Sequence, residues 1–160
     1  MEELNLEEVM KVETKELTKI FVGNVEPLVQ VLKAHLYTEN FLEKVILSAL
    51  ERGDKLVENG SFSYHQKLLI CEATDILPDS LISSLRNLNK LRNKFAHQLD
   101  MNIAESDVLR IGSPLGKTFT QLRFQHANNQ NLLFSSVLVA ICVKLSARCY
   151  ELEHDVGVRA

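Results

Sequence analysis

The segment from Asn131 to Glu153 is the feature of this sequence that most restricts the possible fold. When it is wound as an α-helix, apolar side chains occupy most of its faces instead of a single stripe. A helix of this kind is stable when other helices surround it, so we expect it at the centre of a bundle. Its longest uninterrupted apolar run, Val137 to Val143, is far too short to cross a bilayer, and we expect no membrane association.

The rest of the chain is poor in residues that end helices. Among 160 residues there are only 6 Gly and 3 Pro, whereas Leu, Glu and Lys are frequent, and this composition favours long helices over a many-stranded sheet. The length suits one domain with its own core. We therefore predict an all-α fold, a helical bundle of about five helices with an irregular segment before the last one.

Apolar periodicity and capping residues place these helices within one domain, residues 1–160. The expected helices are 6–21, 25–50, 63–76, 79 to 97 or 99, and 131–153, with a core over about 25–153 and a loose tail over 154–160. Ser61 or Ser63 is the expected cap of the third helix, and Asp79 or Ser80 is that of the fourth.

The connecting segments contain most of the turn-forming residues. Residues 53–62 include two glycines and are predicted as a loop. Residues 100–128 form the irregular segment, in which we expect a short helix at 104–110. A weak alternation of polar and apolar residues over 118–124 predicts a short extended piece.

The charge and the cysteine content narrow the range of functions. The formal net charge of -3 lacks the basic surplus of a protein that coats nucleic acid, so any contact with nucleic acid must be local. Cys71, Cys142 and Cys149 have no paired spacing, which predicts reduced, buried thiols in a cytoplasmic protein. Because the sequence contains no zinc-type spacing of cysteine or histidine, we expect no metal and no cofactor.

Arg92 is a charged residue in an apolar surrounding. The helix that begins at residue 79 carries an apolar stripe on one face, and Arg92 falls in the middle of that stripe. The stripe consists of Leu81, Leu85, Leu88, Phe95 and Leu99. Burying an unpaired charge is very costly, so this guanidinium must meet a carboxylate, a wet cleft or a ligand anion.

Glu39 is a second charge of this kind. It lies at the centre of the apolar stripe of the helix over 25–50, and His35 is close to it. The stripe consists of Leu28, Leu32, Leu42, Ile46 and Leu50. The simplest arrangement pairs Glu39 with Arg92. Such a pair is either a structural buried salt bridge or a functional one, in which Glu39 orients Arg92 at the floor of a cleft.

His97 follows Arg92 by five residues, which places it about 140° away around an ideal helix. It shares its face with Arg86, Lys90 and Asn93 instead. This second face is either a solvated charged surface or a ridge that contacts phosphate.

The segment Asn89–His97 resembles the Arg-polar-x-x-x-His motif of the HEPN superfamily (higher eukaryotes and prokaryotes nucleotide-binding). Arg92 and His97 match the arginine and the histidine, and Asn93 matches the polar residue. The arrangement of a small helical bundle, with the motif late in a helix and an apolar final helix, is similar too. Residues 37–43 of the second helix also resemble the mannitol-operon repressor-like branch of helical proteins.

The HEPN resemblance implies a metal-independent endoribonuclease that acts as a homodimer, often as a toxin or phage-defence component with an antitoxin. Arg92 would stabilise charge on the phosphoryl oxygens, His97 would move a proton, and Asn93 would hold the phosphate or orient His97. Two copies of Arg86, Lys90 and Lys94 would converge in the dimer as cations that bind RNA, and Glu39 is the supporting residue of the site if its pairing with Arg92 is functional.

Two other functions stay open. The mannitol-repressor-like branch implies a non-catalytic regulator that acts through contacts with a protein partner. A small-nucleotide-binding module is the third hypothesis, with phosphates at the ridge of Arg86, Lys90 and His97.

Overall fold

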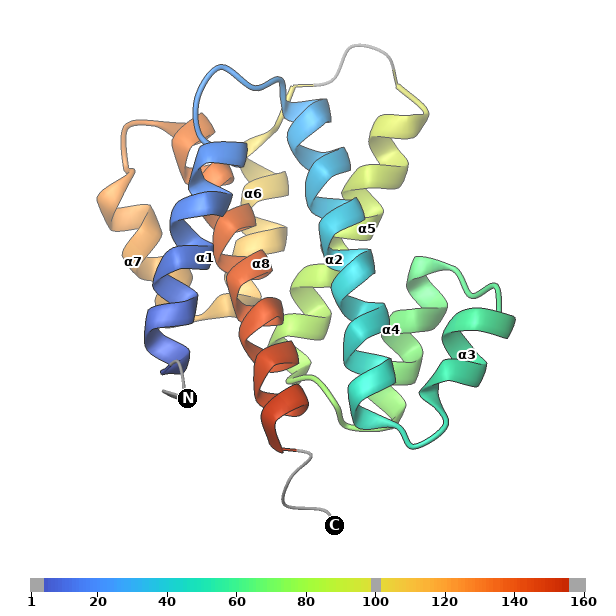
Figure 1. The fold of residues 1–160 in the computed structure, drawn as a ribbon. Helices are drawn as coiled ribbons and strands as arrows, with labels where there is room; N and C mark the ends of the chain where they lie inside the picture. Colours follow the sequence, from blue (N-terminus) through green and yellow to red (C-terminus); the bar gives the residue numbers. More distant parts are fainter. Residues whose placement is uncertain (1–4, 99–101, 156–160) are drawn as a thin grey trace.

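The structure is a computed structural model, in which residues 5–98 and 102–155 are described. All regular secondary structure in these two ranges is helical, which confirms the predicted all-α class (Figure 1). In chain order the elements are α1 (Leu6–Phe21), α2 (Pro27–Ala49), α3 (Gly53–Asn59), α4 (Tyr64–Ala73), α5 (Asp79–Ala96), α6 (Glu105–Gly112), the 3-10 turn η1 (Ser113–Leu115), α7 (Lys117–Gln125) and α8 (Gln130–Asp155). Of the predicted loose tail, residues 154 and 155 belong to α8, and the remainder lies outside the described residues.

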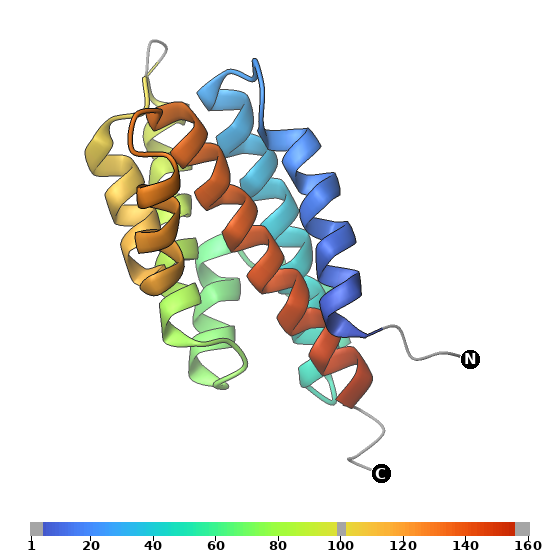
Figure 2. The ribbon, with the colours of Figure 1, turned by 90° about the vertical axis from the view of Figure 1, so that its left-hand side faces the viewer.

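Helix α8 runs through the middle of the bundle, as predicted (Figures 1 and 2). It contacts α1, α2, α5, α6 and α7, and its side chains Phe134, Leu138, Ile141 and Leu145 are exposed by 1% or less. By length and composition alone, Gln130–His154 is also apolar enough to cross a membrane, although the uninterrupted run within it is short. In the bundle, 61% of its most apolar window is buried, a pattern that core helices of soluble proteins share.

Helices α2 and α5 lie side by side and run in opposite directions (Figure 1). The shorter α4 packs against both of them, through side-chain contacts with His35, Thr38, Glu39 and Glu43 of α2 and with Arg86 of α5. In the described ranges, α4 makes no side-chain hydrogen bond, ion pair or ring contact with the first two turns of α2 or the last turns of α5. These last turns of α5 carry the Arg92–His97 motif.

The segment predicted as the loop 53–62 contains a helix, α3. Its first residue, Gly53, is buried against the end of α2, and a Cβ atom there would lie 2.4 Å from the carbonyl oxygen of Ile46. Glycine therefore allows a close contact between the two helices that any other residue would prevent. The glycine that indicated a loop in the sequence is a packing residue in the structure.

The extended piece predicted at 118–124 is also wrong, because these residues lie within α7. Helical spacing places Phe119 and Leu122 on the side of the core. The ring of Phe119 packs directly over Gly112, where a Cβ atom would lie 2.3 Å away. The short helix expected at 104–110 corresponds to α6.

The expected caps are confirmed for α4 and not for α5. At α4, the N–H of Gln66 donates to Oγ of Ser63 and the N–H of Ser63 donates to Oε1 of Gln66, which forms a capping box. At α5, the N-cap is Pro78, whose carbonyl accepts from the N–H of Ile82, and no side chain caps the helix. Asp79 is the first helical residue, where the helix dipole favours a carboxylate.

The apolar stripe predicted for α2 is wrong in its first half. Leu28 and Leu32 are exposed by 38% and 45%, and Leu36 is exposed by 62%. The buried face carries smaller residues instead, among them Val31 and Ala34. Small side chains allow α2 and α8 to pack closely, so the face with the largest apolar residues is not the one that enters the core.

Candidate functional site

Helix α5 carries the motif residues and determines their directions. Four residues of its predicted apolar stripe, Leu81, Leu85, Leu88 and Phe95, are buried and anchor the helix in the core. The fifth, Leu99, lies outside the described residues.

Of the three residues predicted to be catalytic, Arg92 and Asn93 contact each other within one chain, and His97 lies apart from both. Arg92 is half-buried and lies on the side of α5 that faces His35 of α2, whereas His97 is the exposed C-cap of the helix. Nη1 of Arg92 donates to Oδ1 of Asn93 at 3.3 Å. Within the described part of the chain, no contact joins the side chain of His97 to Arg92 or Asn93, in keeping with the separation expected around the helix.

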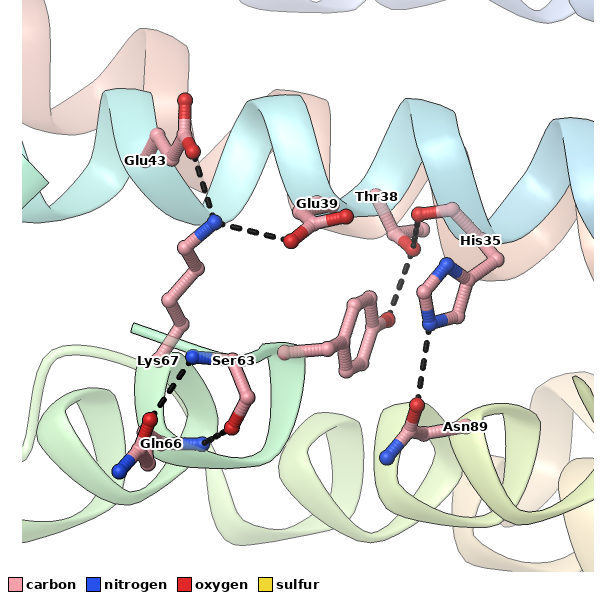
Figure 3. A network of polar contacts seen from close by, with 9 residues as sticks. His35, Thr38, Glu39, Glu43, Ser63, Gln66, Lys67 and Asn89 are labelled. Carbon is pink, nitrogen blue, oxygen red and sulfur yellow. Dashed lines mark hydrogen bonds and ion pairs between the residues drawn. The ribbon is translucent and has the colours of Figure 1, made fainter. Parts of the chain in front are cut away.

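The predicted pair of Glu39 and Arg92 is absent. Oε1 of Glu39 lies 2.9 Å from Nζ of Lys67, and this ammonium also lies 2.7 Å from Oε1 of Glu43 (Figure 3). Lys67 is a buried residue of α4 that reaches across to α2. Burial by itself lowers the pKa of Lys67, but the hydrogen bonds that its ammonium donates to Glu43 and Glu39, together with the charges of these carboxylates, outweigh burial and raise the pKa. The cation that meets Glu39 is thus Lys67 of α4 and not the predicted Arg92 of α5.

His35 forms the centre of a second polar group between the same helices. Its Nε2 lies 3.0 Å from Oδ1 of Asn89 on α5, so this nitrogen is the donor (Figure 3). The imidazole stacks on the ring of Tyr64, the first residue of α4, with 4.2 Å between ring centroids. The hydroxyl of Tyr64 lies 2.7 Å from Oγ1 of Thr38, which completes the link back to α2.

The surroundings of His35 favour its neutral form. Burial lowers its pKa, and the positive charges of Arg92 and Lys67 lower it further. The hydrogen bond to Asn89 and the charge of Glu39 act in the opposite direction without cancelling this effect. A neutral imidazole next to the guanidinium of Arg92 therefore provides no anion for it.

Arg92 differs from the other cations that lie below the surface. The other buried or half-buried Lys and Arg side chains in the described ranges all contact carboxylates: Lys67 contacts Glu39 and Glu43, Arg86 contacts Glu72 at 2.6 Å, and Arg148 contacts Glu151 at 3.3 Å. Arg92 has no carboxylate within 4.0 Å among the described residues, and its Nε is buried without a hydrogen-bond partner. A half-buried guanidinium in this state is suited to bind an anion from solution.

The cations predicted to bind RNA are not equally available. Arg86 is neutralised by Glu72 of α4. Nζ of Lys94 lies 3.5 Å from Oδ1 of Asp107, and Lys90 is exposed with no carboxylate within 4.0 Å in the described part of the chain. Lys90 and Lys94 therefore remain as candidates, and Arg86 is better explained as a link between α4 and α5.

An exposed apolar surface lies next to the motif, and the sequence did not predict it. We call it the α2 ridge, and it consists of Leu28, Leu32 and Leu36, which are exposed and spaced four residues apart on the first half of α2. A row of leucines with this spacing is usual for a helix face that packs against another helix. The sequence did contain a signal for it. Val31 and Ala34 have the helical spacing of a second apolar face with smaller side chains, and this face is buried in place of the leucines.

The cysteines and acidic residues provide no further reactive centre. All three cysteines are free and buried, as expected, and burial raises the pKa of Cys71 and Cys149 to about 12. Thiols of this kind are poor nucleophiles because the thiolate is the reactive form. The described residues contain no group of three or more His, Cys, Asp or Glu side chains that could hold a metal ion.

Comparison of the chain with models of protein families, with curated proteins and with solved structures gives no match.

The lowered pKa of His35 predicts how stability depends on pH. Between that pKa and the ordinary histidine value of about 6.5, the unfolded chain binds a proton that the folded chain does not bind. The free energy of unfolding should therefore fall as the pH drops below about 6.5, and this fall should end below the lowered pKa. Urea unfolding between pH 7 and pH 5 measures the effect.

His35→Phe is the control, because it preserves a ring against Tyr64 but cannot titrate. As the pH falls from 7 to 5, the free energy of unfolding of the parent should decrease relative to that of this variant. An NMR titration that places the pKa of His35 at 6.5 or above would contradict the prediction.

Two equivalent substitutions test the rearranged charges. Lys67→Met leaves Glu39 and Glu43 half-buried without their cation and should lower the free energy of unfolding by about 1–3 kcal/mol. Arg92→Met removes a charge that has no carboxylate partner in residues 5–98 and 102–155, and it should change stability by less than about 0.5 kcal/mol. Urea unfolding of both variants measures these changes in the free energy of unfolding. Equal destabilisation would mean that Arg92 has a protein anion after all.

Proposed function

We propose that the end of α5 binds and cleaves RNA, as a metal-independent endoribonuclease of the HEPN type that acts as a cytoplasmic homodimer. The observation that carries this proposal is the half-buried guanidinium of Arg92, which has no carboxylate partner among the described residues. Guanidinium groups bind phosphate oxygens through paired, charge-assisted hydrogen bonds. A phosphate of the RNA backbone would take the place next to Arg92 that Glu39 was expected to occupy.

The proposed reaction needs two proton transfers. The 2′ oxygen of a ribose attacks the adjacent phosphorus, while the bond from phosphorus to the 5′ oxygen of the next nucleotide breaks. His97 of one copy takes the proton from the 2′ hydroxyl, and His97 of the second copy gives a proton to the leaving 5′ oxygen. Arg92 stabilises the negative charge on the non-bridging oxygens, and Asn93, which accepts a hydrogen bond from it, helps to hold the guanidinium.

A second copy of the chain is part of this proposal because one chain keeps Arg92 and His97 on different sides of α5. Residues on different faces of one helix can border a common cleft when two such helices meet. The α2 ridge supports a dimer of this kind, since it is apolar, exposed and adjacent to the end of α5. Two ridges packed together would bring the two α5 ends close to each other.

The proposal includes an HEPN-like arrangement of the main helices. The helices α1, α2, α4, α5 and α8 correspond to the five that were predicted, and we treat them as an HEPN-like bundle. The short helices α3, α6 and α7 are then additions to its connections. In a cell, such a ribonuclease would act as a toxin or phage-defence component controlled by an antitoxin.

The same ridge favours a second candidate function, a non-catalytic regulator of the mannitol-repressor-like kind. In that case the apolar surface binds a regulatory protein, and the end of α5 binds no RNA. Cleavage of RNA distinguishes the two candidates.

Cleavage of single-stranded RNA by the purified protein in EDTA tests the proposal. Arg92→Ala and His97→Ala should each lower the single-turnover cleavage rate by at least about 100-fold, because each removes a group that acts in the transition state. Arg52→Ala and His65→Ala, which change exposed residues of the same two types elsewhere, should leave the rate unchanged. An inert parent protein, or variants of Arg92 and His97 that cleave normally, would refute the ribonuclease function.

A charge on the α2 ridge tests the dimer. Leu32→Asp should convert the dimer into a monomer at micromolar concentration and lower cleavage in parallel, because a buried carboxylate in an apolar contact is unfavourable. The molecular mass from light scattering during size-exclusion chromatography measures this. Leu69→Asp is a matched control, since Leu69 of α4 is exposed by 44% and Leu32 by 45%. If both variants stay dimeric, the ridge is not the interface.

A further inference from the structure

A small hollow between α5 and α6 lies on the side of α5 that faces away from α2. Its volume is about 70 Å3. It is lined by Asn87, Lys90, Leu91 and Lys94 of α5 and by Asp107, Arg110 and Ile111 of α6. Three of these side chains are cationic and one is anionic. The sequence did not predict this cluster of charges. Helix α6 lies in the segment that was expected to be irregular, and Arg110 follows Lys94 by 16 residues.

Two side chains of α5 hold the end of α6 in place. Nδ2 of Asn87 donates to the carbonyl oxygen of Arg110 at 2.8 Å, and Oγ of Ser84 donates to that of Ile111 at 2.8 Å. The last carbonyl groups of a helix have no partner within it, so these bonds satisfy groups that would otherwise need water. They also fix the position of Arg110 relative to α5, so specific hydrogen bonds hold the two walls of the hollow together.

The hollow has an excess of positive charge. Its carboxylate, Asp107, is buried and already engaged, because Oδ2 accepts from the N–H of Ala104 at 3.0 Å and Oδ1 faces Lys94 at 3.5 Å. Lys90 and Arg110 are exposed, and within the described ranges neither has a carboxylate within 4.0 Å. Cations concentrated in this way in a chain of net charge -3 indicate a local site for an anion.

The hollow has room for a phosphoryl group. Its volume of about 70 Å3 is several times the roughly 10–15 Å3 that a cavity needs to hold one water molecule. Lys94 precedes His97 by three residues, a rise of about 4.5 Å along the helix, so the hollow borders the same helix end as the proposed cleavage site.

We propose that Lys90, Lys94 and Arg110 bind a second backbone phosphate of the RNA strand whose neighbouring phosphate is cleaved at Arg92 and His97. This inference rests on the proposed function, and it names a binding subsite outside the motif. Arg110 is the cation that the structure adds to the predicted set, whereas Arg86 leaves that set because Glu72 neutralises it. The strand would then pass over the end of α5 from the side of α2 to the side of α6.

Binding of a fully 2′-O-methylated single-stranded RNA, which lacks the attacking hydroxyl, tests this subsite. Fluorescence anisotropy across a series of salt concentrations yields the slope of log affinity against log salt. Arg110→Gln should weaken binding and reduce the slope by about 0.7, the contribution of one phosphate contact in a single strand. Arg110→Lys preserves the charge and should preserve the slope. Arg52→Gln, which removes an exposed arginine at the start of α3, should change neither quantity.

The outcomes separate this inference from the proposed function. If the parent protein does not bind this RNA, or if Arg92→Gln leaves binding unchanged, the proposed function is overturned whatever Arg110 does. If Arg92→Gln weakens binding while Arg110→Gln behaves like Arg52→Gln, the proposed function stands and the second phosphate site is overturned. A slope that falls with Arg110→Gln and not with Arg110→Lys supports the subsite.

Discussion

The arrangement of charges at the candidate site depends on the contact of Lys67 with Glu39 and Glu43. This ammonium satisfies two half-buried carboxylates of α2 at once, at 2.9 and 2.7 Å. It also holds α4 against α2, where Tyr64 stacks on His35. Glu39 thus meets Lys67 and not Arg92, whose guanidinium has no carboxylate within 4.0 Å among the described residues.

The end of α5 presents a different chemical character on each of its sides. Towards α2 it carries Arg92, which has no carboxylate within 4.0 Å among the described residues, together with His35 and the apolar α2 ridge. Towards solvent it carries His97, and towards α6 it borders a hollow with three cations. Under the proposed function, these sides border RNA and a second copy of the chain.

Several features could be predicted because they depend on local periodicity. The all-α class, the central position of α8, the buried stripe of α5 and the cap at Ser63 follow from the spacing of apolar and capping residues along the chain. The errors concern features that depend on a neighbour. Gly53 indicated a loop, yet it allows α3 to approach α2, and Leu32 was assigned to the core although Val31 packs there instead. Both errors arise because the distance between packed helices cannot be derived from the sequence.

The position of Arg92 within an apolar stripe, and that of His97 on another side of the same helix, could be derived from the sequence because both follow from the geometry of an α-helix. The packing of the helices against one another, by contrast, sets which carboxylate meets which cation. Helical periodicity defines the direction of a side chain from its own axis, but it does not define which helix lies in that direction or at what depth. For that reason the pairing of Glu39 with Lys67, and the proximity of Arg110 to Lys90, became visible only in the folded chain.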